Sequence, residues 1–210
     1  MLYAEAAPDK TALLKLGVMP LLNRHAAETL DPAATRRVVR REVVVYFDDW
    51  NDWPLAALRR SLYRATATVA AEQLAPSMRL SDILGDLGQR LHVHLIVLLD
   101  RFEDLLLAPT PGAGHRQFAN ELAEAVNETN LPTNFLIALN EAARPRLATL
   151  RALIPGFDDF SLKLATRREV EAPTEPMPIP ASIVRASLGQ RLYAMIKRAF
   201  SRISARTAVH

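Results

Sequence analysis

Three acidic residues follow one apolar run of the sequence and could bind a cation or activate a water molecule. Asp100 ends the run at residues 93–99, and Glu103 and Asp104 follow within one turn. A run of β-branched residues and leucines without polar alternation predicts a strand buried on both faces, as in a parallel sheet. An Asp at the carboxyl end of such a strand can hold the Mg²⁺ of a bound nucleotide. The alternative is that Asp100 caps a following helix, since Asp is a favoured N-cap residue.

The elements that would position these acids are predicted from the apolar patterns around them. Residues 43–47 and 134–139 are further buried-type runs, which end on Asp48 and on Asn140, and residues 160–164 alternate as an edge or final strand does. Helical spacing covers residues 9–25, with Pro20 shortening or kinking the helix, and residues 54–69, 81–91, 115–129 and 146–153. Ser81 is the predicted cap of its helix. This alternation of strands and helices predicts an α/β fold with a parallel sheet and right-handed crossovers.

Two tryptophans follow the second predicted strand. Trp50 and Trp53 flank acids in a loop before Pro54. They could stack on a ligand, but such residues more often cover a core edge.

Composition excludes several classes of site and partner. The 210 residues contain no cysteine, which excludes disulfides, thiolate metal sites and a cysteine nucleophile. Residues 1–5 do not resemble the start of a signal peptide, and no apolar run approaches the roughly 18 residues that span a bilayer. We therefore expect a cytoplasmic protein. Six basic residues and no acid follow Glu175, and removing them from the formal charge of +3 leaves −3 for the first 175 residues. That balance argues against a nucleic-acid-binding face on the main domain.

The last 40 residues have a different organisation. Four prolines make residues 171–180 a stiff linker. Residues 181–206 carry one apolar stripe at helical spacing, with basic side chains over much of the rest: the stripe comprises Ile183, Val184, Leu188, Leu192, Ile196, Ala199, Phe200 and Ile203. Such a basic amphipathic helix could make peripheral contact with an anionic membrane, or pack on the acidic domain of its own chain or on a second copy.

Residues 7–22 and 99–105, taken together, resemble the Walker A helix and the Walker B strand of STAND-class P-loop NTPases, which are regulatory relatives of the AAA+ ATPases. In that family a Lys-Ser/Thr pair precedes two leucines, a basic residue and a Gly-hydrophobic-hydrophobic-Pro turn; here Lys10-Thr11 precedes Leu13-Leu14-Lys15 and Gly17-Val18-Met19-Pro20. Residues 45–58, 135–141 and 154–157 are similar to the family's second strand and helix, its next strand and its Ile-Pro-Gly turn. The resemblance spans about residues 5–170, and we take 1–170 as the domain. It implies a three-layer αβα P-loop NTPase-like fold in which the Asp100 strand lies between the other two well-marked strands.

The resemblance also implies roles for individual residues, with ATP and Mg²⁺ as cofactors. Lys10 would contact the β- and γ-phosphates, Thr11 and Asp100 would bind Mg²⁺, Glu103 would be catalytic by polarising the attacking water, and Asn140 would sense the γ-phosphate. Without that resemblance, Lys10 reads as a solvated lysine at a helix start and Glu103 as an acid of a helix turn. The family's regulatory role implies a protein partner or self-association, with no nucleic acid.

The chain departs from the family pattern at the phosphate loop. Ala4 and Asp9 stand where the family has glycine, and Pro8 has no N–H to offer a phosphate. Little chain precedes Ala4 for the strand expected there, and the winged-helix and repeat domains of the family are missing after residue 170. We therefore expect a truncated, ATP-binding regulatory module with a degenerate Walker A and weak or lost hydrolysis. The alternative is a protein-interaction or remnant domain that keeps the fold without binding nucleotide.

Overall fold

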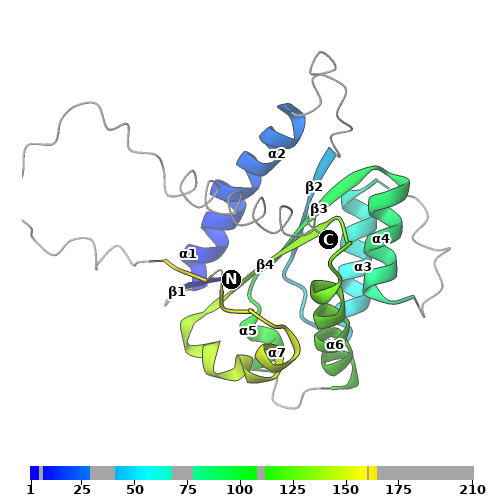
Figure 1. Cartoon of the computed structure of the whole chain (residues 1–210). Coiled ribbons are helices and arrows are strands. Elements are labelled where there is room, and N and C mark those ends of the chain that lie inside the picture. The colour runs from blue at the N-terminus through cyan, green and yellow to red at the C-terminus, as the bar shows by residue number, and fades with distance from the viewer. Residues whose placement is uncertain (5–6, 29–40, 68–77, 108–111, 160, 165–210) are drawn as a thin grey trace, which may run out of the picture.

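Five parallel strands form one sheet in the computed structural model, which describes residues 1–4, 7–28, 41–67, 78–107, 112–159 and 161–164 (Figure 1). The strands are β1 (Leu2–Ala4), β2 (Arg41–Phe47), β3 (Val93–Leu99), β4 (Thr133–Asn140) and β5 (Leu162–Lys163). Their order is β2-β3-β4-β1-β5, and every neighbouring pair is parallel. The predicted α/β fold and its three well-marked parallel strands are confirmed, with the Asp100 strand between the other two. The predicted linker 171–180 and helix 181–206 lie outside the described residues.

The strand β1 forms although the sequence leaves little chain for it. Its three residues lie between two partners, with Leu2 opposite Ala138 of β4 and opposite Leu162 of β5. Leu2 is fully buried, so a very short strand is stabilised by ladders on both sides and by core packing. The last strand is shorter than the predicted 160–164, and it pairs only with β1 in the described chain.

The two faces of the sheet are covered by different helices. The first face carries α3 (Pro54–Ala65), α4 (Leu80–Arg90) and α6 (Ala113–Asn127), and their apolar side chains pack on alternate strand residues such as Val45, Val97 and Ile137. The opposite face carries the helical segment 7–28, which packs on Ile96 and Ala138. Because strand side chains alternate, even-numbered residues of β2, β3 and β4 point toward this second face.

The segment 7–28 continues past Pro20, where the sequence predicted a kink or an end. It consists of α1 (Ala7–Ala12), a π-helical stretch η1 (Leu13–Val18) and α2 (Met19–Glu28). The Met19 N–H donates to Leu14 O, five residues back. Pro20 cannot donate the bond that an α-helix would direct to Leu16 O, and the wider π turns accommodate this lost donor. The helix is therefore adjusted before Pro20 rather than broken there.

The remaining helices begin close to their predicted bounds, with one wrong cap. Ser81 lies inside α4, which makes no side-chain cap bond; instead Glu121 of α6 accepts the Leu80 N–H at 2.7 Å. The predicted helix 146–153 is a 3₁₀ helix η3 (Glu141–Leu147) followed by α7 (Ala148–Leu153), and α5 (Glu103–Leu106) is a single short turn. Within the described ranges, none of these helices has the length and hydropathy to cross a membrane.

Candidate functional site

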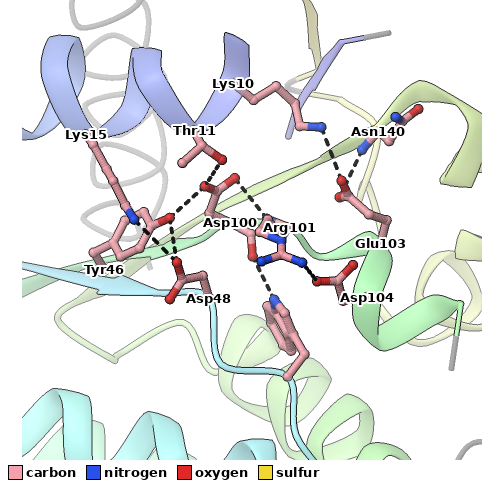
Figure 2. A network of polar contacts seen from close by, with 11 residues as sticks. Lys10, Thr11, Lys15, Tyr46, Asp48, Asp100, Arg101, Glu103, Asp104 and Asn140 are labelled. Carbon is pink, nitrogen blue, oxygen red and sulfur yellow. Dashed lines mark hydrogen bonds and ion pairs between the residues drawn. The ribbon is translucent and has the colours of Figure 1, made fainter. Parts of the chain in front are cut away.

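All five site residues predicted from the sequence meet at the carboxyl edge of the sheet (Figure 2). Asp100 follows β3 directly, Glu103 opens α5, and Asn140 ends β4. Lys10 and Thr11 lie in α1, which follows β1. Parallel strands place their carboxyl ends at one edge, so residues about 90 positions apart in sequence become neighbours.

Asp100 is fully buried, and its carboxylate accepts hydrogen bonds from α1, from β2 and from the next residue. Its Oδ2 accepts the hydroxyl of Thr11 at 2.6 Å and that of Tyr46 at 2.7 Å, and its Oδ1 accepts the Arg101 N–H at 2.9 Å. The alternative that Asp100 caps a helix is wrong, since Phe102 occupies the N-cap position of α5. The carboxylate instead joins β3 to α1 and β2.

Lys10 and Glu103 form a buried ion pair beside this carboxylate. Lys10 is 0% exposed and its Nζ lies 3.4 Å from Glu103 Oε1, so it is not a solvated helix-start lysine. The Oε2 atom of Glu103 accepts the backbone N–H of Asn140 at 3.0 Å. The Asn140 side chain turns to the start of η3, where its Oδ1 accepts the Ala142 N–H at 3.0 Å. Asn140 thus meets Glu103 through its backbone.

A second group of side chains, missed by the sequence analysis, flanks Asp100. The Tyr46 hydroxyl lies 3.1 Å from Asp48 Oδ2 as well as 2.7 Å from Asp100, and with one proton it can donate to only one of them at a time. Lys15 lies 3.5 Å from Asp48 Oδ2, and 4.5 Å above the centre of the Tyr46 ring. Two features of the sequence could have identified this group. Tyr46 is an even-numbered residue of β2 and therefore points toward the face that carries the segment 7–28. Lys15 follows Thr11 by one helical turn on that segment.

The protonation of Tyr46 follows from these contacts. Burial raises the pKa of the Tyr46 hydroxyl above its ordinary value, and the hydrogen bond and the negative charge of Asp100 raise it further. Tyr46 is therefore a neutral hydrogen-bond donor at physiological pH.

Two residues shape the turn on which the acids lie. Trp50 is buried, packs edge-on against Phe47 and Phe102, and donates its Nε1–H to Asp100 O at 2.7 Å. It therefore covers a core edge and holds the turn, whereas Trp53 is largely exposed. Arg101 has a φ of 53°, a left-handed conformation uncommon for a side chain of this kind. The acids on either side of it, Asp100 and Glu103, both contact α1.

The residues of this site fit the Mg²⁺ of a magnesium nucleotide better than they fit its phosphates. A hydroxyl and a carboxylate oxygen are ligands that Mg²⁺ takes, and nucleotide-bound Mg²⁺ needs only one or two such protein ligands. No group of three or more His, Cys, Asp or Glu residues suitable for a metal occurs in the described ranges. On the phosphate side, α1 already begins at Ala7, and Pro8 supplies no N–H. A glycine loop wrapping the phosphates is therefore not formed by residues 7–9.

Comparison of this chain with protein-family models, with curated proteins and with solved structures gives no match. The functional argument consequently depends on the geometry of the site and on the sequence pattern.

Proposed function

We propose that this chain is an ATP-binding regulatory module of the STAND NTPase type, with weak or lost hydrolysis. One observation carries the proposal: Lys10 and Thr11 of α1 converge on Glu103 and Asp100 beyond β3, at the carboxyl edge of a parallel sheet. A lysine and a hydroxyl facing a strand-end carboxylate is the arrangement that P-loop NTPases use for a magnesium nucleotide. The position of β3 between β2 and β4 agrees with the same assignment.

Each side chain has a distinct part in this proposal. Thr11 and Asp100 would hold Mg²⁺, since their oxygens are adjacent and of the kind that Mg²⁺ prefers. The ion would supply positive charge that neutralises the phosphates. Lys10 would turn from Glu103 to a phosphate, which is a stronger anionic partner for its ammonium group.

The start of α1 explains why we propose weak or lost hydrolysis. Phosphoryl transfer depends on precise positioning of the phosphates and of the attacking water. Residues 7–9 are helical and Pro8 has no N–H, so few backbone donors could hold the γ-phosphate in place. Binding without turnover suits a switch that reports nucleotide by changing its affinity for a partner protein or for a second copy.

A second candidate function rests on the start of α1. Because residues 7–9 are helical and Pro8 lacks an N–H, few backbone donors remain for phosphates. A protein-interaction domain would keep the same fold and use the Lys10–Glu103 pair as a purely structural contact. The two candidates differ in whether nucleotide stabilises the chain.

The test is the melting temperature of the chain with several millimolar ATP, with Mg²⁺ and with a chelator. A ligand present at about ten times its Kd stabilises the native state by about 1.4 kcal/mol. For a chain of this size we expect a rise of about 3–5 °C with MgATP. The rise should be absent in Lys10→Met and in Asp100→Asn, and it should shrink when the chelator removes Mg²⁺. Phosphate release should stay at background.

Lys15→Met is the matched control, because Lys15 lies on the same helical segment but pairs with Asp48 outside the proposed phosphate position. It should keep the MgATP-induced rise. The readout is the rise within each variant, so that a change in basal stability does not enter. Absence of any rise in the wild-type chain would refute nucleotide binding and favour the interaction domain.

A further inference from the structure

The second face of the sheet has room for a helix beyond the one described. Strands lie about 4.8 Å apart, so five of them span about 19 Å, whereas one helix is about 10 Å wide. Among the described residues, the only helical members of the apolar cluster on this face come from the segment 7–28: they are Leu13, Leu14, Val18, Met19 and Leu22. One helix cannot cover this width.

The direction of the segment 7–28 determines which part of the face it leaves. Its first part, α1, lies on β1 and β4, and α2 lies on β2, so the helix crosses the sheet diagonally (Figure 1). It moves away from β5 as it goes. The side chains toward that edge are nevertheless apolar and little exposed: Leu2, Leu136 and Leu164 are 0%, 6% and 6% exposed, and Leu162 is partly buried. We call these four residues the β5-side patch.

The rest of the chain supplies a segment of matching chemistry. Residues 181–206 have a leucine- and isoleucine-rich stripe flanked by basic side chains, and the first 175 residues carry net negative charge. The described chain ends at Leu164, a member of the β5-side patch. Sixteen residues, 165–180, then precede the stripe, and at about 3.3 Å each they can span about 50 Å. A segment tethered so close has a high effective concentration at the patch.

We propose that residues 181–206 dock as a second helix on the β5-side patch of their own chain, with the apolar stripe against the sheet. The patch supplies apolar area of the right width, the tether starts beside it, and the opposite charges favour the approach. Docking on the same chain also removes the stripe from water without a membrane or a second copy. This inference is independent of nucleotide binding.

The absence of cysteine allows a direct test on the full chain. In the Leu162→Cys variant, a single thiol reports access to the patch through its rate of alkylation. Adding Leu192→Asp places a charge in the middle of the stripe and should speed alkylation by about tenfold or more, because a buried leucine contact is lost. The matched control is Ser201→Asp, nine residues further and on the opposite side of the same helix, which should leave the rate unchanged. Trp fluorescence verifies that the sheet domain is folded in each variant.

Three results would overturn the proposal. Equal alkylation rates with and without Leu192→Asp would mean that the stripe does not cover the patch. Protection that increases with protein concentration, with a dimer in light scattering, would mean that a second copy supplies the cover. Pelleting of the chain with anionic vesicles, with an alkylation rate that neither Leu192→Asp nor the vesicles change, would assign the stripe to a membrane surface.

Discussion

Removing only one partner of the buried pair of Lys10 and Glu103 should lower the free energy of unfolding. Lys10→Met leaves the Glu103 carboxylate beneath the surface without its cation, and we expect a loss of about 3–5 kcal/mol in the free energy of unfolding. Adding Glu103→Gln removes the orphaned charge, so the double variant should be more stable than Lys10→Met alone. Urea unfolding followed by circular dichroism measures both values.

Lys15→Met serves as the comparison for this pair. Lys15 and Asp48 are both well exposed, and such ion pairs contribute about 0–1 kcal/mol. Equal losses for Lys10→Met and Lys15→Met would contradict the buried ion pair.

Tyr46 gives the site a dependence on alkaline pH. Since its pKa is raised on folding, its contribution to stability is complete below the ordinary tyrosine pKa of 10.0 and is lost as the pH rises above that value. At pH 8, Tyr46→Phe should cost about 1–2 kcal/mol, because a hydrogen bond to a carboxylate is removed. The difference between the two proteins should narrow between pH 10 and 11, as measured by chemical denaturation. A constant difference across that range would contradict the donor role of the hydroxyl.

For single residues, the sequence predicted which side chains meet, but not their burial or their hydrogen-bond partners. The family resemblance of residues 7–22 and 99–105 implied that Lys10 and Thr11 lie beside the strand-end carboxylate of Asp100, and they do. The burial of Lys10 was not predictable, because a lysine at a helix start is normally solvated. Tyr46 was missed because a tyrosine on a strand usually indicates packing, and its hydroxyl partners Asp48 and Asp100 lie just after the ends of β2 and β3.

Among the elements, α4 offers a pair of glycines with opposite expected behaviour. A Cβ at Gly88 would overlap Pro132 just before β4, whereas at Gly85 the nearest atom is Leu131 Cδ2 at 3.4 Å. Gly88→Ala should therefore destabilise the protein by about 1–3 kcal/mol through overpacking. Gly85→Ala should be neutral or stabilising by up to about 1 kcal/mol, since alanine favours the helix. Thermal unfolding of the two variants decides, and a destabilisation of equal size in both would contradict the close approach of α4 to Pro132.

The elements themselves were predictable where their pattern is local. The apolar runs of β2, β3 and β4 and the Pro54 start of α3 follow from sequence alone. The cap of α4 by Glu121 depends on a tertiary contact, which a single segment does not encode. Pro20 predicts that its helix is disturbed, but the sequence does not decide between a kink, an end and the π turns that form. The strand β1 is too short for any periodicity, and it exists because two neighbouring strands pair with it.

For the whole molecule, alternation of strands and helices predicted a parallel sheet, and the family resemblance predicted the position of β3. Neither predicted that the last described strand, β5, would pair with the first, so that the two ends of the described chain meet at one edge of the sheet. That closure places Leu164, the last described residue, in the β5-side patch. The negative net charge of the first 175 residues and the basic side chains of the segment 181–206 also attract each other across the whole molecule.

The strands that pair with β1 are synthesised much later than β1, and this affects the order in which the protein folds. During synthesis the first four residues emerge long before β4 and β5, the only strands that pair with them in the described chain. Closing loops of more than 130 residues is slow, and we expect β1 to dock after β2, β3 and β4 have associated. Asp100 and Glu103 would then already lie at the edge of the folded strands. Lys10 and Thr11, which follow β1 in the chain, would join them last. The candidate site would thus be assembled only in a chain that has finished folding, and an unfinished chain would present acids without their basic partner.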